Sequence, residues 1–319
     1  MKQTVLVTGA NGFVGRALCV DLVRRGYTVR AAVRERSCAI GLPGELVQIA
    51  DTGADADWSS AIAGIDAVVH LAARVHVMRD NVLQPLAAFR AVNVVPTERL
   101  ARAAAAQGVK RFVYVSSIKV NGEGTPPGRP YTPDDVPAPV DSYGISKHEA
   151  EQALRQLARE AGLEVVIIRP VLVYGPGVKA NFLSMMRWLH RGIPLPLGAI
   201  NNQRSLVALD NLVDLIVTCL HHPKALNQTF LVSDGEDLST TALLRRTAAA
   251  LGRPARLIPV PALVLRTTAR LLGKADFAQR LCGSLQVDIS KTRELLGWVP
   301  PVSVDEALKQ TARHFLANL

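Results

Sequence analysis

Tyr143 and Lys147 stand four positions apart in the segment Tyr-Gly-Ile-Ser-Lys. In a helix, residues four apart lie on one face, so the phenol and the ammonium can meet in one pocket. A tyrosine titrates near pH 10, and a neighbouring cation favours its phenolate, which eases proton exchange near neutral pH. Ser117 ends another apolar segment, where its hydroxyl could hydrogen-bond an oxygen of a substrate. Together these residues predict a proton-transfer site.

A second chemical signal is the glycine-rich run at 8–15, which reads TGANGFVG. It follows a β-branched segment and opens an apolar-periodic one, which is the strand–turn–helix context of a dinucleotide site. Its glycines let the turn tighten and the backbone approach a pyrophosphate at the positive end of the helix. A purely structural turn is the alternative. The predicted cofactor contacts in this run are Gly9, Asn11, Gly12, Phe13, Val14 and Gly15.

The choice of cofactor turns on the residue after the second strand. NAD-binding proteins place an acid there for the ribose hydroxyl, whereas this chain has Arg34. An arginine can fork onto a 2′-phosphate, which favours NADP(H) and leaves NAD(H) possible. A solvated Arg34 and a ribose contact from Glu35 are the alternatives. Asp51, with Thr52 beside it, is placed to meet the adenine, or to cap the helix that follows.

These side chains need a scaffold, and the order of apolar segments predicts an α/β fold. Short apolar strands alternate with amphipathic helices, which indicates a Rossmann-like, doubly wound parallel sheet covered on both faces. The carboxyl ends of its strands then share one edge, where ligands bind. The predicted strands are 4–8, 27–33, 46–50, 67–71, 112–116 and 165–168, and the helices are 13–23, 55–63, 86–107 and 142–161.

After Pro170 the pattern becomes rich in proline and glycine. We predict a dinucleotide-binding domain over 1–170 plus 203–235, and a smaller, mostly helical C-terminal substrate domain over 171–202 plus 236–319. The segments between include predicted helices at 182–190 and 210–222 and a strand at 229–232.

Composition narrows the class of protein. In 319 residues, 37 Lys and Arg against 27 Asp and Glu leave a net charge of +10. Aromatic residues make up only 5%, which disfavours stacking on single-stranded nucleic acid and leaves acidic ligands as the expected partners. Four scattered cysteines without metal-ligand spacing, and the lack of a signal or long apolar segment, predict a cytoplasmic protein without metal. The stretch 262–283 could be a basic amphipathic helix for a membrane surface or an ordinary packed helix.

The motifs resemble those of the extended short-chain dehydrogenase/reductases, the NAD-dependent epimerase/dehydratase family. The likeness covers essentially the whole chain and is greatest for the nucleotide-sugar branch, the UDP-hexose 4-epimerases and the UDP-N-acetylquinovosamine-forming 4-ketoreductases of O-antigen pathways. The matching segments are TGANGFVG, VVHLAA at 68–73, VSSIKVNG at 115–122, YGISK, RPVLVYGPG at 169–177, QRSLVALD at 203–210 and DISKTRELLGWVP at 288–300.

This resemblance implies roles for individual residues. Tyr143 would be the acid/base, Lys147 would hold the nicotinamide ribose, and Ser117 would bind the oxygen at sugar C4. Asn181 and Arg204 would bind the nucleotide diphosphate, against the plainer readings of a helix cap and a surface arginine. The remaining implied cofactor contacts are Leu71, Ala72, Ala73, Asn93, Pro170 and Val173. The substrate contacts that we predict are Ser117, Lys119, Asn181, Arg204 and Arg280.

Two departures from the family pattern bear on the reaction. The 4,6-dehydratases carry Thr-Asp-Glu where this chain has Ser117-Ile118-Lys119, which disfavours dehydration. The family's late substrate clamp is incomplete, and Arg280 is a candidate replacement. We therefore predict reduction of a 4-keto nucleotide sugar by NAD(P)H, because Arg34 favours net NADPH consumption. The alternative is a UDP-hexose 4-epimerase with tightly bound NAD, and a non-catalytic cofactor-binding scaffold is a third interpretation.

The family often pairs through a four-helix interface. The helices at 86–107 and 142–161 could supply it here, so a homodimer is expected.

Overall fold

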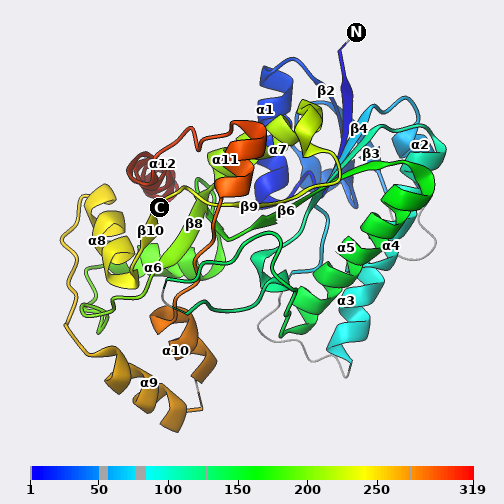
Figure 1. Ribbon diagram of the computed structural model, residues 1–319. Helices are drawn as coiled ribbons and strands as arrows, with labels where there is room; N and C mark the ends of the chain where they lie inside the picture. Colours follow the sequence, from blue (N-terminus) through cyan, green and yellow to red (C-terminus); the bar gives the residue numbers. More distant parts are fainter. Residues whose placement is uncertain (1, 50–56, 76–83, 127, 274) are drawn as a thin grey trace.

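A seven-stranded parallel sheet forms the centre of the computed structural model, which describes residues 2–49, 57–75, 84–126, 128–273 and 275–319 (Figure 1). The strand order is β3-β2-β1-β4-β5-β6-β9, with every neighbouring pair parallel. This confirms the predicted doubly wound fold. The strands are β1 (Thr4–Thr8), β2 (Thr28–Val33), β3 (Glu45–Gln48), β4 (Ala67–His70), β5 (Arg111–Val115), β6 (Glu164–Pro170) and β9 (Thr229–Val232).

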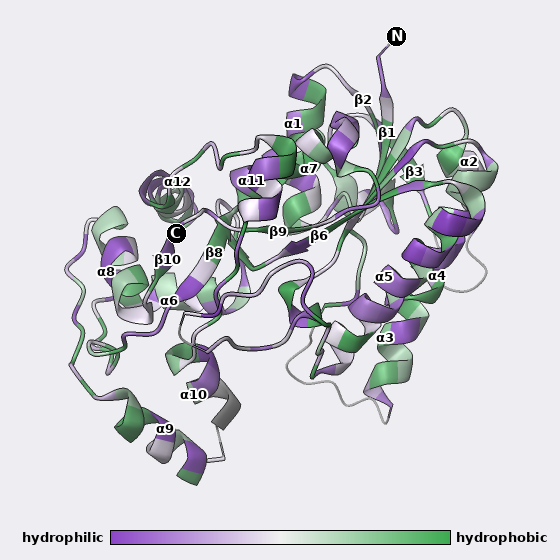
Figure 2. Ribbon diagram, in the orientation of Figure 1, coloured by the Kyte–Doolittle hydropathy of each residue, from purple (hydrophilic) through white to green (hydrophobic). Residues whose placement is uncertain are grey.

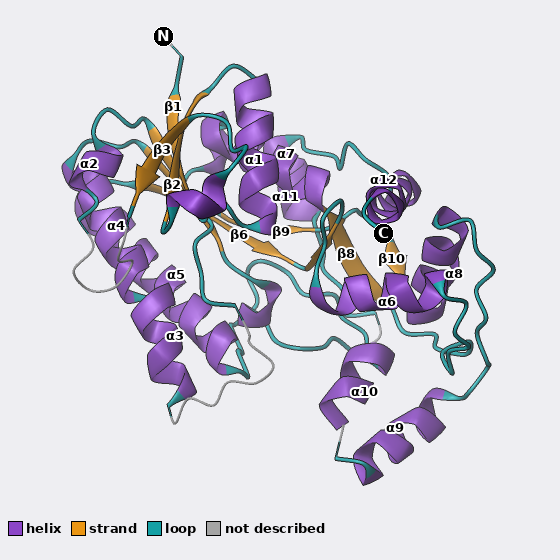
Figure 3. Cartoon of the chain, turned by 180° about the vertical axis from the view of Figure 1, so that it is seen from behind, coloured by secondary structure: helices purple, strands orange, loops and turns teal. Residues whose placement is uncertain are grey.

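Helices cover both faces of this sheet (Figure 3). Alternate residues of a strand point to opposite faces, and β1 shows this: Val5 and Val7 join one apolar core, while Leu6 joins the other. Both cores exclude water, which explains why the central strands read as continuous apolar runs. On one side lie α1 (Phe13–Arg24), α7 (Leu209–His221) and α11 (Ser290–Leu296), and on the other α2 (Ser59–Ile62), α4 (Val95–Ala106) and α5 (Ser142–Ala161).

The helix predicted over 86–107 is in fact two helices, so that expectation was wrong. α3 (Pro85–Asn93) ends before Val94, and α4 starts at Val95. The break has a local cause, since Pro96 has no N–H to donate and its ring would collide with the carbonyl one turn back. In the first turn of a new helix, that missing N–H costs nothing. Asn93 thus becomes the last residue of α3, where it is buried.

A smaller sheet of β10 (Asp237–Leu238), β8 (Arg204–Ala208) and β7 (Leu172–Tyr174) forms a second layer. We assigned residues 203–235 to the dinucleotide-binding domain, and within that segment β9 joins the central sheet and α7 packs on it. β8, a strand that we did not predict, pairs in the smaller sheet instead. Around it lie α6 (Ala180–His190), α8 (Thr240–Ala250) and α12 (Val304–Ala317). The helices α9 (Ala262–Leu271) and α10 (Ala275–Cys282) extend to one extremity of the molecule (Figure 1), and short 3₁₀ turns are η1 (Arg36–Ala39), η2 (Ile118–Val120) and η3 (Pro223–Ala225).

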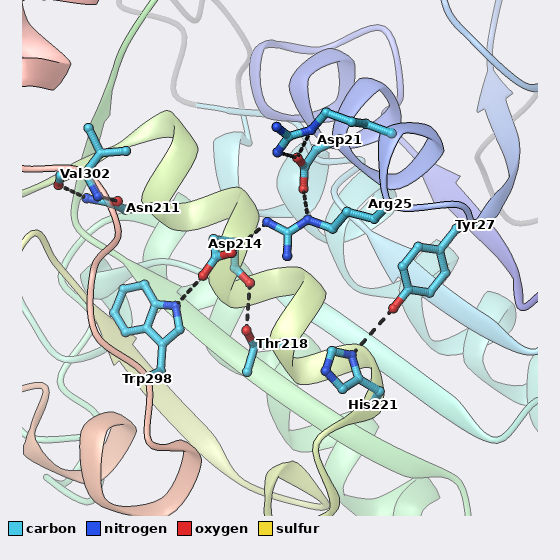
Figure 4. A network of polar contacts seen from close by, with 10 residues as sticks. Asp21, Arg25, Tyr27, Asn211, Asp214, Thr218, His221, Trp298 and Val302 are labelled. Atoms are coloured by element: carbon cyan, nitrogen blue, oxygen red, sulfur yellow. Dashed lines mark hydrogen bonds and ion pairs between the residues drawn. The ribbon is translucent and has the colours of Figure 1, made fainter.

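A polar network fastens the chain's C-terminal part to the helices on the sheet (Figure 4). Asp214 of α7 accepts hydrogen bonds from Arg25 at 2.6 Å and from the Trp298 indole at 2.8 Å. Asn211, one turn earlier, exchanges two hydrogen bonds with the backbone of Val302, at 2.8 and 2.9 Å. Because these partners come from distant parts of the chain, the network fixes how the 298–302 segment crosses α7.

In the described part of the chain, no helix is both long enough and apolar enough to cross a bilayer.

A buried ion pair joins α5 to the sheet. Arg169 of β6 donates to both oxygens of Glu151 of α5, at 2.9 and 2.6 Å, and to the Asn121 side chain at 2.9 Å. Both charged side chains are shielded from water. A fork of two parallel hydrogen bonds fixes the distance and the rotation of α5 relative to β6.

We predict that Glu151→Gln lowers the free energy of unfolding by about 3 kcal/mol, because Arg169 would keep its buried charge without a counter-charge. Glu160→Gln, on an exposed position of the same helix, should change it by less than about 0.5 kcal/mol. Urea unfolding of both variants checks this. Equal effects for the two would mean that the buried pair does not stabilise the fold.

Candidate active site

The glycine-rich turn lies at the carboxyl end of β1, where it touches the segment that follows β4. Gly9 has a left-handed backbone (φ +65°), and a Cβ placed on it would lie 2.8 Å from the amide nitrogen of Ala72. A Cβ on Gly15 would overlap the carbonyl oxygen of Gly9. Only glycines allow the two backbone segments and the start of α1 to approach this closely.

The start of α1 suits a pyrophosphate. The helix begins after Gly12, and no side chain caps it. The first amides of a helix have no intrahelical acceptor, and they carry partial positive charge. Ser116, after β5, is also buried, and its hydroxyl has no hydrogen-bond partner among the described residues. Open amides and an orphaned hydroxyl on the same sheet edge fit a dinucleotide.

The predicted adenosine end is described in part. Arg34 follows β2 with its side chain exposed, and its carbonyl oxygen accepts from Gln48 at 3.1 Å. Asp51 and Thr52 lie outside the described residues.

Arg16 was missed by our sequence analysis. Its guanidinium donates to the carbonyl oxygens of Cys38 at 2.6 Å, Ile40 at 3.1 Å and Asn11 at 3.3 Å. It thereby ties the loop after β2 to the glycine-rich turn. Its place directly after Gly15 was the available signal.

His70, at the end of β4, is the centre of a chain of directed hydrogen bonds. The Thr97 hydroxyl donates to the carbonyl oxygen of Asn93 at 2.7 Å, so its oxygen must accept from Nε2 of His70, 2.9 Å away. Nδ1 of His70 then accepts from the Thr8 hydroxyl at 2.7 Å. Burial, followed by the charge of Lys147, lowers the pKa of His70 to about 3. The imidazole is therefore neutral, with its proton on Nε2.

The same chain positions the segment after β4. The oxygen of Thr8 accepts from the amides of Leu71 and Ala72, both at 3.2 Å. Leu71, Ala72 and Ala73 are partly exposed at the sheet edge beside the glycine-rich turn, as predicted cofactor contacts must be.

Asn93 extends the connection to α5, the helix that carries Tyr143 and Lys147. Its amide group bonds the backbone of Arg74 twice, at 2.7 and 3.1 Å, and donates to the Ser146 hydroxyl at 3.0 Å. Ser146 in turn donates to the carbonyl oxygen of Tyr143 at 2.8 Å. Asn93, predicted as a cofactor contact, thus braces the first turn of α5.

Lys147 is buried on α5, one turn after Tyr143. Its ammonium donates to the carbonyl oxygen of Val115 at 2.8 Å and lies 4.5 Å from the centre of the Tyr114 ring. Burial lowers the pKa of Lys147 to about 7, although the charge of Glu151 opposes that shift. The lysine can therefore gain or lose a proton near neutral pH.

For Tyr143 the predicted direction of the pKa shift was wrong. Burial raises its pKa to about 12, with the hydrogen bond to Ser117 opposing and the charge of Asp141 adding to the rise. Desolvation of the phenolate is the largest cause of the shift, whereas we had expected a neighbouring cation to dominate. Tyr143 is therefore a neutral phenol at pH 7, and Ser117, the residue predicted to bind the sugar oxygen, lowers its pKa against the effect of burial.

The predicted substrate contacts are spread over both layers. Lys119 bonds the carboxylates of Asp141 and Glu123, the second at 3.1 Å. It therefore supports the N-cap of α5. Asn181 is exposed on α6, whose N-cap is Lys179, so the alternative of a helix cap does not apply.

Arg204 lies at the start of β8 and points toward the end of α10. Its guanidinium donates to the carbonyl oxygens of Arg280 and Gly283, both at 3.1 Å. The side chain of Arg280 itself is exposed. Burial lowers the pKa of Arg204, so it is more than a surface arginine. Pro170 is buried at the end of β6, and Val173 is partly buried in β7.

A family model described as NAD dependent epimerase/dehydratase family matches residues 5–233. The chain belongs to this family. That confirms the resemblance in the motifs and the prediction of an enzyme. This member of the family is 51% identical over 319 residues to a UDP-glucose 4-epimerase of Vibrio cholerae, covering 99% of this chain and 96% of the relative.

Two further relatives span the whole chain. One is the N-acetyl-alpha-D-glucosaminyl-diphospho-ditrans,octacis-undecaprenol 4-epimerase of Escherichia coli O157:H7, 27% identical and covering 98% of this chain and 96% of its own. The other is the solved structure of MoeE5 in complex with UDP-glucuronic acid and NAD. It is 26% identical, has a TM-score of 0.77, and covers 99% of this chain and 100% of its own.

We predict that His70→Leu removes a stability loss in acid. The unfolded chain protonates His70 below about pH 6.5, but the folded protein does so only near pH 3. The free energy of unfolding of the wild-type protein should therefore fall by about 2 kcal/mol between pH 7.5 and pH 5, and this fall should be absent in the variant. At pH 7.5 the variant should be less stable by about 1–3 kcal/mol, because Thr8 and Thr97 lose a partner. Urea unfolding at both pH values measures this, with the exposed His314→Gln as control.

Proposed function

We propose that the protein interconverts UDP-hexoses that differ in configuration at C4, with NAD as a retained cofactor. The supporting observation is the 51% identity, over essentially the full length, to a protein named UDP-glucose 4-epimerase. The positions of Ser117, Tyr143 and Lys147 on one sheet edge agree with it. The cofactor bound beside a UDP-sugar in MoeE5 is NAD, which favours NAD(H) over NADP(H) here.

In this proposal a dinucleotide held at the glycine-rich turn would supply reversible hydride transfer at sugar C4, with the hydride returned to the opposite face, so that the sugar has no net redox change. The hydroxyl proton at C4 would leave to the phenolate form of Tyr143, which is the minor form because burial raises its pKa, and would come back from the phenol. Protonated Lys147 favours that phenolate, and its pKa of about 7 keeps both of its forms accessible. Ser117 donates a hydrogen bond where negative charge develops on the C4 oxygen.

The reduction of a 4-keto sugar, our first interpretation of the sequence, uses the same residues and differs in consuming NADPH. It rests on Arg34, whose side chain is exposed after β2. Dehydration has no support in the site, because Lys119 stands where dehydratases carry an acid and is bonded to Asp141 and Glu123.

The decisive assay follows UDP-glucose and UDP-galactose with purified protein. Wild-type protein should equilibrate them, and Tyr143→Phe should lower kcat by about 10²–10⁴-fold because the proton has no acceptor. Tyr27→Phe is the matched control and should keep full activity, because Tyr27 is a partly buried tyrosine whose hydroxyl lies 3.5 Å from Nδ1 of His221. If UDP-hexoses do not equilibrate but a UDP-4-keto-6-deoxyhexosamine oxidises NADPH, the reductase is the correct function.

The cofactor is tested separately by calorimetry with NAD and NADP. We expect tighter binding of NAD by the wild-type protein, and unchanged NAD affinity in Arg34→Ala, since NAD has no 2′-phosphate for the guanidinium to bind. Arg36→Ala, whose guanidinium bonds the Leu46 carbonyl instead, is the neighbouring control. Tighter NADP binding that Arg34→Ala abolishes would overturn the choice of NAD.

A further inference from the structure

The helix α9 leaves its apolar side chains in solvent. None of its ten residues is buried. Leu263 is 72% and Leu271 88% exposed, and Val264 and Leu272 are exposed as well. A surface helix of a globular protein normally turns such side chains into the core. The face formed by these four residues, here called the α9 face, is left uncovered by the described part of the chain.

The α9 face is apolar along its length. Val264 and Leu271 are seven residues apart and share one stripe of the helix. Thr267 lies between them, and its hydroxyl bonds the carbonyl oxygens of Leu263 and Val264, both at 3.0 Å. A hydroxyl satisfied within the helix does not need water, so it can enter an apolar environment.

The helix is nevertheless firmly attached. Leu265, on its inner side, packs against the core of the small domain. Arg266 donates to the carbonyl oxygen of Cys282 at 2.8 Å, which fastens α9 to the end of α10. The two helices form an extremity of the molecule in both views (Figures 1 and 3), and hydrophobic and hydrophilic residues alternate along α9 (Figure 2).

The segment of the chain that contains α9 is strongly basic. The segment 253–283 contains six basic residues and one acidic residue, Asp276, so it carries half of the chain's net charge of +10. Within the part of the chain that the structure describes, five of the six form no ion pair: Arg253, Arg256, Arg266, Arg270 and Arg280.

These features together select one kind of partner. A second copy bound through the same face would bring two sets of unpaired arginines together, because a twofold interface pairs a patch with itself. The phosphates of nucleic acid would match the charge, but its backbone offers no apolar surface in which the exposed leucines could be buried. An anionic bilayer offers phosphates to the arginines and an apolar layer to the leucines.

We propose that α9 docks the protein on an anionic lipid bilayer, with the α9 face in the headgroup region. Arg204, predicted to bind the nucleotide diphosphate, donates to the backbone carbonyls of Arg280 and Gly283 at the end of α10, the helix that follows α9. If Arg204 binds substrate, as the proposed function implies, docking holds the substrate end of the molecule close to the lipid surface. The protein binds there reversibly, and its affinity falls as salt screens the arginines.

Sedimentation with phospholipid vesicles tests this. Wild-type protein should sediment with vesicles of equal parts phosphatidylglycerol and phosphatidylcholine, and remain in solution with phosphatidylcholine alone. Leu271→Gln and Arg270→Glu should each weaken the binding by about tenfold or more, through lost apolar contact and reversed charge. Leu319→Gln and Arg159→Glu, at exposed positions elsewhere, are the matched controls and should bind as wild type.

Equilibration of UDP-hexoses in solution should be unchanged in Leu271→Gln and Arg270→Glu, which checks that they fold. Because sedimentation does not depend on turnover, it remains informative even if the epimerase assay fails. Absence of wild-type protein from the anionic pellet would refute membrane docking. So would light scattering that shows Leu271→Gln splitting an oligomer while vesicle binding stays intact, since α9 would then join copies of the chain.

Discussion

The arrangement of the candidate active site at the carboxyl edge of the central sheet depends on one neutral, buried histidine. The Thr97 hydroxyl donates its proton to the Asn93 carbonyl, so it can only accept from Nε2 of His70. The proton of His70 must therefore be on Nε2, and Nδ1 accepts from the Thr8 hydroxyl. This fixed order of donors aligns the turn after β1, the segment after β4 and the start of α4. The side chain of Asn93 then donates to Ser146, which connects these segments to α5. A charged imidazole would reverse one of these bonds, and burial, by lowering its pKa, prevents that.

Much of this site could be predicted from the sequence because its strongest signals are local. A glycine-rich turn between a strand and a helix, and a tyrosine and lysine one helical turn apart, need no knowledge of distant contacts. Parallel strands bring their carboxyl ends to one edge, so Ser117 could be placed near Tyr143 before the fold was known. Pro96 is a local signal for a helix break. We nevertheless predicted one continuous helix, because the helical spacing of apolar residues continues across that proline.

What could not be predicted depends on pairings between distant segments. Nothing near Lys119 in the sequence indicates that its ammonium will form an ion pair with Asp141. Likewise, Arg204 donates to a backbone carbonyl of α10, which is far from it in the sequence. The direction of the Tyr143 pKa shift depends on how completely the fold removes water, which a motif cannot express. Likewise, the exposure of the α9 face follows from where the domain's other helices lie, since its sequence would suit a buried helix equally well.

The place of β9 in the sheet has a consequence for synthesis. The strand that completes the central sheet is the last of the seven to leave the ribosome, after β7 and β8 of the smaller sheet have already appeared. Until residue 232 is made, the edge of β6 has no partner strand, and an open edge invites pairing with other chains. The central sheet therefore cannot be complete before the strands β7 and β8 of the smaller sheet have been synthesised. A chain truncated near residue 170 would expose that edge to chaperones.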